Sequence, residues 1–427
     1  MKALILAGGE ASRLGDLAKA MPKPMMPLCG RPVLERQIDL LKRYGITDIT
    51  LITGRLGNII EEYFGSGEKF GVKLSYHQES APLGTMGVLK EMEALLPDEF
   101  LVLYSDVMLD MDFGRLLNFH KEKKADCTLV LHPNDHPHDS DLVELDSDRR
   151  AVAVHPKPHD ENTFYRNQAN AGIYIGSKKI LAFAESGKKA DFARHILPDI
   201  VGKMRVYGYV TPEYLKDIGT PERLAAVSKD FESGRVRNCN LDHPRPTVFL
   251  DRDGVINKEC GLVYKPEQFE LNPRAGQAIR LLNKAGWLAL VISNQPVIAR
   301  NLCDFAGLEL ITKKMDTLLG AEGAFLDGVY YCPHHPDKGY PEENPAYKID
   351  CACRKPKTGM VEQAAKDFNP AMAASYFVGD ADADVLCGRR AGLKTIGIKS
   401  HRLIKEKPDF ECADLFEAVQ LILGRNA

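Results

Sequence analysis

No hydrophobic run in the sequence reaches the roughly 18 residues that a transmembrane helix needs. The short apolar run at the N-terminus ends at Gly8-Gly9, which favours a strand over a signal peptide. The sequence also has no excess of charge of one sign, because 56 basic residues stand against 59 acidic ones. This balance argues against disorder and against a nucleic-acid-binding surface. Ten cysteines among 427 residues are too few for a disulfide scaffold. These absences predict a soluble cytoplasmic protein without a membrane or nucleic acid as partner.

The hydrophobic pattern predicts two α/β domains. Hydrophobic residues make up 44% of the chain, enough for more than one core, and the length favours two or three domains. Short apolar runs alternate with segments of helical period, as expected for βαβ units and a mostly parallel sheet. The expected strands are 2–6, 48–53, 73–76, 100–104, 247–250, 288–293 and 376–378, and the expected helices are 32–44, 56–64 and 84–96.

The alternation lapses in residues 231–246, which include Pro244 and Pro246 and show no clear period. We interpret this segment as a linker. It would separate a first domain, residues 1–230, from a second, residues 247–427, each with a Rossmann-like doubly wound fold. A long loop in the second domain is rich in proline, histidine and cysteine, and predicts a zinc-binding loop.

The residues after the first expected strand are suited to binding a triphosphate. Gly8 and Gly9 allow backbone N–H groups to approach phosphates, and Arg13 adds a positive charge. On these three residues alone, a tight turn with a surface arginine is an equally good interpretation. Lys23 strengthens the phosphate hypothesis, because a proline on each side restricts its backbone. Its ammonium group can then be held where charge develops on phosphorus.

Further motifs follow in order along the N-terminal half. Asp106 comes at the carboxyl end of an expected strand, where the ligand sites of α/β proteins lie. The ordered set resembles the sugar-1-phosphate nucleotidyltransferase family over nearly all of residues 1–230. The motifs that carry this resemblance are Leu6–Leu14, Met21–Leu28, Gln78-Glu79 with Pro82–Thr85, Tyr104–Asp106, Asn170–Tyr174 and Asp217–Glu222.

The resemblance implies roles for individual residues. The first loop and the lysine would bind the triphosphate, and a glutamine and a Leu-Gly-Thr segment would face the base. Two aspartates would hold Mg²⁺, which proteins usually bind through a few carboxylates and substrate phosphates. By position, the residues that would bind the triphosphate are Gly8, Gly9, Arg13 and the catalytic Lys23, and those that would face the base are Gln78, Gly84 and Thr85. The aspartates that would hold Mg²⁺ are Asp106 and Asp217, and the residues near the sugar are Asn170 and Gly172.

The sequence departs from the family pattern at several positions. Ala11-Ser12 stand where the family usually has Gly-Thr, and Ser105 precedes the metal aspartate where the family often has Gly. Pro156 stands where the family usually has a glutamate that binds a sugar hydroxyl. The identity of the sugar therefore stays open. A domain that binds nucleotide without turning it over also remains an alternative.

The second domain begins with two carboxylates directly after an expected strand. Asp251 and Asp253 lie two residues apart, and because the strand ends there, the second can curl back over the first. This arrangement predicts that Asp251 is a nucleophile that attacks phosphorus. It also predicts that Asp253 is the general acid and base, which protonates the leaving alkoxide and then activates water. The alternative is a solvated turn, which the partner motifs downstream disfavour.

Three later motifs complete this predicted phosphatase site. Ser293-Asn294 ends another expected strand and offers donors to phosphate oxygens, and Lys355 can neutralise the phosphate and the aspartate. Asp380 follows an apolar strand and is expected to join the two earlier aspartates in holding Mg²⁺. In this order the motifs resemble the haloacid-dehalogenase superfamily of phosphatases over residues 247–427.

The long loop carries a metal-binding pattern. Cys332 and His334 are followed, after 16 residues, by Cys351 and Cys353. Three thiolates and one imidazole make a closed tetrahedral zinc set, and zinc would order a loop that lacks a core of its own. His335 is an alternative ligand to its neighbour. Cysteines that happen to lie near an unrelated histidine are the alternative to a metal site.

Within the superfamily, the sequence resembles the D-glycero-D-manno-heptose 1,7-bisphosphate phosphatase family. The resemblance rests on the zinc motif, on Asp251–Asn257 and on Asn294–Arg300. It implies that Arg354 and Lys355 contact substrate phosphate or sugar. The histidinol-phosphate phosphatases share the same scaffold, zinc loop included, so the chemistry is better defined than the substrate.

Together the two resemblances imply a bifunctional enzyme of nucleotide-activated heptose synthesis. The second domain would remove the 7-phosphate of heptose 1,7-bisphosphate, and the first would transfer a nucleotidyl group, preferably GMP from GTP, to heptose 1-phosphate. The alternatives are uridylyl or adenylyl transfer to another sugar, a histidinol-phosphate phosphatase, or a nucleotide-sensing first domain that regulates the phosphatase. The sequence leaves open whether the chain forms a homo-oligomer.

Overall fold

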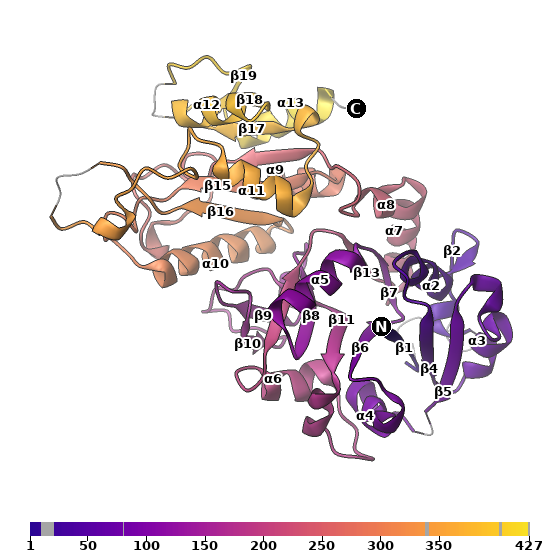
Figure 1. The fold of residues 1–427 in the computed structure, drawn as a ribbon. Helices are drawn as coiled ribbons and strands as arrows, with labels where there is room; N and C mark the ends of the chain where they lie inside the picture. Colours follow the sequence, from indigo (N-terminus) through magenta and orange to yellow (C-terminus); the bar gives the residue numbers. More distant parts are fainter. Residues whose placement is uncertain (10–20, 80, 338–340, 401–403, 426–427) are drawn as a thin grey trace. The chain divides into compact units, whose positions relative to one another are not determined.

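The computed structural model describes residues 1–9, 21–79, 81–337, 341–400 and 404–425. Contacts divide the chain into two compact units (Figure 1). The first comprises Met1–His132, Ser140–Lys157 and Gln168–Asn240, and the second comprises Pro133–Asp139, Pro158–Asn167 and Leu241–Ala427. The division near residue 240 falls inside the predicted linker, and two short segments of the N-terminal half group with the second unit. No helix among the described residues is long and apolar enough to cross a membrane.

The first unit is built on a nine-stranded sheet with the order β10-β9-β11-β6-β1-β4-β5, and β8 joins β12 to β11. Strands β1 (Lys2–Ala7), β4 (Asp48–Thr53), β5 (Lys73–Gln78) and β6 (Glu99–Tyr104) run parallel where the sequence predicted strands. The expectation of a mostly parallel sheet does not hold for the other half. There β11 (Ala169–Ser177) runs antiparallel to both β6 and β8, so the sheet is mixed. The remaining strands are β8 (Cys127–His132), β9 (Leu142–Leu145), β10 (Ala151–His155) and β12 (Val206–Val210).

Helices cover both faces of this sheet: α2 (Val33–Arg43), α3 (Gly57–Phe64) and α5 (Phe113–Lys123) on one, and α4 (Gly84–Glu91) and α6 (Leu197–Ile200) on the other. Successive side chains of strand β1 point to opposite faces of the sheet. Ala3 and Ile5 pack in the cluster that contains α2, α3 and α5, whereas Leu4 packs in the cluster that contains α4 and α6. Side chains of a strand point alternately to opposite faces, so a strand buried on both faces is apolar throughout.

Two short strands bring distant parts of the first unit together. Strand β7 (Val107–Asp110) pairs antiparallel with β13 (Tyr214–Asp217), and Asp217 lies opposite Val107. The pairing therefore places Asp217 next to the turn that carries Asp106. The next helix is α7 (Pro221–Glu232), which ends at the start of the predicted linker. It is followed by α8 (Arg235–Asn238), which lies inside the predicted linker, so this segment is partly helical.

The second unit is built on a six-stranded parallel sheet with the order β16-β15-β14-β17-β18-β19. Its strands are β14 (Thr247–Leu250), β15 (Leu288–Asn294), β16 (Gly328–Cys332), β17 (Tyr376–Gly379), β18 (Lys394–Ile398) and β19 (Phe410–Cys412). Helices α9 (Ala275–Ala285), α10 (Phe305–Ala321) and α13 (Leu415–Arg425) pack on one face, and α11 (Gly359–Phe368) and α12 (Asp382–Arg390) on the other. Because the strands are parallel, the residues that follow β14, β15 and β17 meet at one edge of the sheet.

The segment Pro158–Asn167 packs within the second unit against α10. The guanidinium of Arg166 lies 2.7 Å from a carboxylate oxygen of Asp316 and 3.2 Å from one of Glu309. The Asp316 side chain is 7% exposed, and a buried ion pair of this kind is costly to break. This pair therefore anchors the segment to the unit with which it groups.

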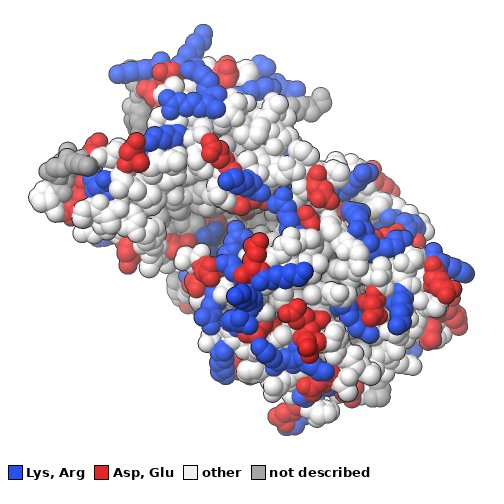
Figure 2. Space-filling model, viewed as in Figure 1, with Lys and Arg blue, Asp and Glu red and all other residues white. Residues whose placement is uncertain are grey.

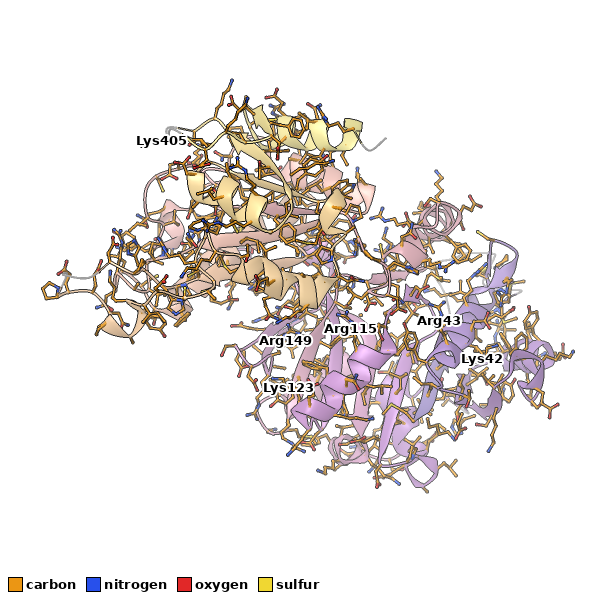
Figure 3. All side chains as sticks on the ribbon, turned by 45° about the horizontal axis from the view of Figure 1, so that its top comes forward. Lys42, Arg43, Arg115, Lys123, Arg149 and Lys405 are labelled. Atoms are coloured by element: carbon orange, nitrogen blue, oxygen red, sulfur yellow. The ribbon has the colours of Figure 1, made fainter. Side chains whose placement is uncertain are left out.

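Charged side chains of both signs are interspersed on the face of the molecule drawn in Figure 2. Several cations labelled in Figure 3 are paired with nearby acids. Arg43 lies 3.1 Å from Asp110, and Arg115 lies 3.6 Å from Asp112. In both pairs the arginine is exposed to solvent while the aspartate is largely buried, so water screens the attraction in part.

Two candidate active sites

The first site centres on an ion pair between Lys23 and Asp106. Lys23 begins a short 3-10 helix, η2 (Lys23–Met25), and its Nζ atom lies 2.6 Å from Oδ2 of Asp106. Lys23 is only 9% exposed, so its charge acts in a partly buried place where screening by water is weak. Asp106 follows β6 directly after Ser105, at the carboxyl end of a strand as predicted.

Asp217 lies beside this pair. The backbone N–H of the next residue donates to the carbonyl of Asp106 at 2.8 Å, which joins the two aspartate segments. The Asp217 carboxylate accepts hydrogen bonds from Nη1 of Arg223 at 2.7 Å and from the N–H of Gly219 at 3.0 Å. Burial alone would raise the pKa of Asp217, but these hydrogen bonds and the charge of Lys23 lower it overall. The structure thus brings together the lysine and the two aspartates to which the family resemblance gives a role in holding magnesium.

A buried glutamine that the sequence analysis missed supports the Asp106 turn. Gln37, on α2, is 1% exposed, and its Nε2 atom donates to the carbonyls of Tyr104 at 3.1 Å and Val107 at 2.6 Å. These two carbonyls flank the turn, so the glutamine holds its shape. The available signal was a polar residue on the apolar face of an expected helix.

The glycine loop and the predicted base-binding segment are close in space. A Cβ atom on Gly8 would clash with the carboxylate of Glu79, whereas no described atom lies within 4 Å of a Cβ placed on Gly9. Burial raises the pKa of Glu79. Gln78 is exposed at the end of β5. Arg13 lies outside the described residues, so its predicted phosphate contact stays a prediction.

Gly84 and Thr85 begin α4 and are bound to a neighbouring segment. Gly84 has a φ of +74°, and a Cβ atom there would come within 2.7 Å of the carbonyl oxygen of Ala190. The Thr85 hydroxyl lies 3.2 Å from a carboxylate oxygen of Asp191 and accepts a hydrogen bond from the N–H of Phe192 at 2.7 Å. These contacts give both residues a structural role, and their predicted contact with a base stays a prediction.

Asn170 and Gly172, predicted near the sugar, lie on β11. The Oδ1 atom of Asn170 accepts a hydrogen bond from the N–H of Gly172 at 3.2 Å. Gly172 has a φ of +72°, and a Cβ atom there would come within 2.8 Å of the ring of Tyr104. Because β11 pairs with β6, both residues lie on the strand next to the one that leads into Asp106.

The second site is a buried cluster of three carboxylates and one lysine. Carboxylate oxygens of Asp251, Asp380 and Asp384 lie within 4.8 Å of one another. The Nζ atom of Lys355 lies 2.9 Å from Oδ1 of Asp251 and 2.6 Å from Oδ1 of Asp384. Gly254 leaves room for Asp380, because a Cβ atom there would clash with that carboxylate. A compact set of carboxylate oxygens is the ligand type that Mg²⁺ prefers.

Asp384 is the member of this cluster that the sequence analysis missed. Its Oδ2 atom accepts hydrogen bonds from the N–H groups of Asp380 at 3.2 Å and Ala381 at 3.0 Å. Burial raises the pKa of Asp384 to about 6, against the opposing effect of Lys355. Asp380 precedes α12, whereas Asp384 lies in its first turn, so the spacing rule for residues on one helix face does not join them.

The predicted phosphate-binding residues hold one another in place. Oδ1 of Asn294 accepts a hydrogen bond from the N–H of Lys355 at 3.0 Å, and Nδ2 of Asn294 donates to the Lys355 carbonyl at 3.1 Å. The Nζ atom of Lys355 also donates to the carbonyl of Ile292 at 2.8 Å. The Ser293 hydroxyl lies 3.1 Å from Nε2 of Gln295. These contacts fix the lysine between two carboxylates.

Asp253 lies next to this cluster in sequence, but its carboxylate has other partners. It accepts hydrogen bonds from the side chains of Arg252 and Gln295. The third member of the carboxylate cluster is Asp384, whereas the sequence analysis expected Asp253 to join Asp251 and Asp380. A contact between Asp253 and Mg²⁺ therefore stays a prediction.

The cysteine and histidine loop brings its four predicted ligands together. The Sγ atoms of Cys332, Cys351 and Cys353 lie between 3.1 and 3.5 Å from one another, and Nδ1 of His334 lies 3.4 Å from Sγ of Cys353. Zinc bonds of about 2.0–2.3 Å imply roughly 3.3–3.8 Å between the ligands of a tetrahedral site. The four atoms are therefore near the spacing that a zinc ion requires.

His335 and Arg354, which are adjacent in sequence to these four residues, have other contacts. His335, the alternative ligand, lies outside the four-residue group, and its Nδ1 atom is 3.5 Å from the carboxylate of Asp337. Arg354 donates from its backbone N–H to Sγ of Cys351 at 3.3 Å and from Nη1 to the carbonyl of His334 at 2.9 Å. The arginine predicted to contact substrate is thus hydrogen-bonded to the loop that carries the three cysteines and His334.

Comparison with protein-family models decides the family. Residues 2–234 match the model described as nucleotidyl transferase. The chain belongs to the nucleotidyl transferase family. In this nucleotidyl transferase, residues 352–416 also match a model described as HAD-hydrolase-like. Both resemblances that the motifs suggested are therefore confirmed at the level of family.

Curated relatives of this nucleotidyl transferase include both nucleotidyltransferases and phosphatases, each of which is similar to part of the chain. A mannose-1-phosphate guanylyltransferase of Mycobacterium tuberculosis is 33% identical over 235 residues, which are 54% of this chain and 65% of the relative. A D-glycero-beta-D-manno-heptose-1,7-bisphosphate 7-phosphatase of Haemophilus ducreyi is 41% identical over 152 residues, which are 35% of this chain and 81% of the relative. A UTP–glucose-1-phosphate uridylyltransferase of a Synechocystis species is 30% identical over 343 residues, which are 77% of this chain and 81% of the relative. The chain thus joins a nucleotidyl transferase to a region of the bisphosphate phosphatase family.

Proposed function

We propose that this protein is a bifunctional enzyme that makes a nucleotide-activated heptose. The domain of residues 247–427 hydrolyses the 7-phosphate of D-glycero-D-manno-heptose 1,7-bisphosphate. The domain of residues 1–230 transfers a nucleotidyl group, GMP from GTP, to the resulting heptose 1-phosphate. The observation that carries the proposal is that each domain holds a buried lysine against a carboxylate beside a strand end, Lys23 with Asp106 and Lys355 with Asp251.

In the phosphatase site, Asp251 supplies the nucleophile. Its carboxylate oxygen forms a bond to phosphorus as the bond to the sugar oxygen breaks, and Asp253 gives a proton to that oxygen. Asp253 then takes a proton from the water that attacks the aspartyl phosphate, which releases phosphate and restores Asp251. Lys355 neutralises charge on the phosphate during both steps. Mg²⁺ held by Asp251, Asp380 and Asp384 would screen the phosphate charge.

In the transferase site, an oxygen of the sugar phosphate attacks the α-phosphorus of the nucleotide, and pyrophosphate leaves. Lys23 stabilises the negative charge that develops on the transferring group. Arg223 holds the Asp217 carboxylate in its orientation beside Asp106. Mg²⁺ held by these two aspartates would neutralise the triphosphate.

The products test the whole proposal. Heptose 1,7-bisphosphate incubated with equal amounts of GTP, UTP and ATP and with Mg²⁺ is expected to yield GDP-heptose, identified by mass spectrometry. The guanylyltransferase relative supports GTP, whereas the uridylyltransferase relative makes UTP the second candidate. UDP-heptose or ADP-heptose as the main product would overturn the choice of donor. Phosphate release without any nucleotide sugar would favour a sensory first domain, and faster turnover of histidinol phosphate would overturn the substrate.

We propose further that Cys332, His334, Cys351 and Cys353 bind a structural Zn²⁺ in the second unit. A bound metal stabilises a loop whose own residues provide little apolar core. Cys351→Ser is expected to lose the zinc and to lower the Tm of this unit. Even a loss of about 2 kcal/mol corresponds to roughly 4–8 °C for a domain of this size.

Elemental analysis and scanning calorimetry measure these two effects on the full-length protein. Cys260→Ser is the matched control, because Cys260 is an exposed free thiol of the same unit. It is expected to keep both the zinc and the Tm. Wild-type protein free of zinc would refute the metal site.

A further inference from the structure

The carboxylate of Asp253 is held by two buried side chains that the proposed mechanism does not use. Nη2 of Arg252 lies 2.9 Å from Oδ1 and 3.0 Å from Oδ2 of Asp253, and Nε of Arg252 lies 3.1 Å from Oδ1. Nε2 of Gln295 donates to Oδ2 at 2.7 Å. Both oxygens of the carboxylate therefore have donors from within the protein, and these donors define its orientation.

Gln295 connects this group to the rest of the site. Its Oε1 atom accepts a hydrogen bond from Nη2 of Arg252 at 3.0 Å, and its Nε2 atom also lies 3.1 Å from the Ser293 hydroxyl. Its backbone N–H donates to the carbonyl of Cys332 at 2.8 Å, and the residue is only 1% exposed. A buried amide with this many directed contacts has little rotational freedom. It can therefore impose its own orientation on Asp253.

Arg252 and Gln295 differ in what their removal would leave behind. Arg252 is completely buried, and its Cζ atom lies 5.6 Å from the ring centre of Tyr331. Removal of the arginine would leave the Asp253 carboxylate without its counter-charge, which destabilises a fold strongly. Removal of the neutral Gln295 amide takes away neutral hydrogen bonds to Asp253, Arg252 and Ser293, but it keeps the ion pair. Gln295 is therefore the contact whose effect on the reaction can be separated from its effect on folding.

We propose that Gln295 is the positioning residue for the general acid and base Asp253. This inference rests on the proposed phosphatase function. In the first step a proton moves from the Asp253 carboxyl to the leaving sugar oxygen, as the bond from that oxygen to phosphorus breaks and the bond from Asp251 to phosphorus forms. A carboxyl group that turns away misses the leaving oxygen. Gln295 acts on the reaction only by preventing this rotation.

The test uses the full-length protein and two substrates that differ in their need for a proton. Heptose 1,7-bisphosphate releases a poor alkoxide leaving group, whereas 2,4-dinitrophenyl phosphate releases a stable phenolate that needs no acid. Gln295→Ala and the isosteric Gln295→Glu are expected to lower kcat/KM for the bisphosphate by about 10²-fold. For the aryl phosphate the loss is expected to stay below about tenfold. Both values are measured on one preparation, so a reduced folded fraction cancels in their ratio.

Two further variants make the outcome decisive. Gln363→Ala is the matched control, because Gln363 is an exposed glutamine of α11 that bonds Asp367, and its ratio is expected to equal that of the wild type. Asp253→Asn is expected to change the ratio at least as much as the Gln295 variants. An unchanged ratio in Asp253→Asn would overturn the general-acid assignment itself. A changed ratio in Asp253→Asn, together with an unchanged ratio in both Gln295 variants, would overturn only the positioning role.

Discussion

Replacement of Asp251 by Asn is expected to abolish phosphate release from heptose 1,7-bisphosphate, with kcat lowered by on the order of 10³-fold or more. A neutral amide cannot form the aspartyl phosphate that the proposed mechanism requires. The substitution is nearly isosteric, and Lys355 keeps its contact with Asp384 at 2.6 Å, so the fold of the second unit is expected to persist. Inorganic phosphate measured over time gives the rate.

Nucleotidyl transfer is the internal control for this variant. With heptose 1-phosphate supplied directly, Asp251→Asn is expected to form nucleotide sugar at the wild-type rate, because Asp251 lies in the second unit and Lys23 in the first. Loss of both activities would contradict independent sites. Full phosphate release by the variant would show that another group is the nucleophile.

Lys23→Ala is expected to lower nucleotidyl transfer by about 10²–10³-fold, the usual cost of removing one group that stabilises a developing charge. The substitution also leaves Asp106 without the cation that now lies 2.6 Å from it, so the triphosphate meets an uncompensated carboxylate. Pyrophosphate release from the full-length protein, with heptose 1-phosphate and GTP, measures the effect.

Two controls accompany the lysine variant. Lys121→Ala removes an exposed lysine of α5 and is expected to leave transfer unchanged. Phosphate release from the bisphosphate is expected to stay at the wild-type rate in both lysine variants. A Lys23→Ala protein with undiminished pyrophosphate release would refute the role of Lys23 and favour a domain whose catalysis depends on other groups.

The two sites differ in how much of each could be read from the sequence. Lys23 and Asp106 are 83 residues apart, and their proximity was inferred from a resemblance between ordered motifs, which a hydrophobic pattern by itself could not supply. The positions of Asp251 and Asp380 follow from a physical rule. Both come directly after apolar strands, and the carboxyl ends of parallel strands meet at one edge of the sheet. The rule locates an edge of the sheet, but it does not say how each side chain turns there. For this reason Asp384 was missed, and the partners of Asp253 were not foreseen.

The supporting residues were the hardest to predict. Gln37 and Gln295 are neutral, buried and far in sequence from the carbonyl or carboxylate groups that they bind. The apolar face of its helix indicates that Gln37 is buried, but no local pattern says which groups such a glutamine binds. Their roles depend on which backbone groups the fold brings within hydrogen-bonding distance.

The sequence by itself determined the two α/β halves, the positions of the first strands of each, and the grouping of three cysteines with one histidine. These features follow from hydrophobic period and from short spacings, which are properties of neighbouring residues. Only the tertiary structure decided that β11 returns antiparallel to β6, and that Asp384 rather than Asp253 joins the carboxylate cluster. Strand direction and side-chain orientation depend on packing between segments far apart in the chain, and no local pattern contains that information.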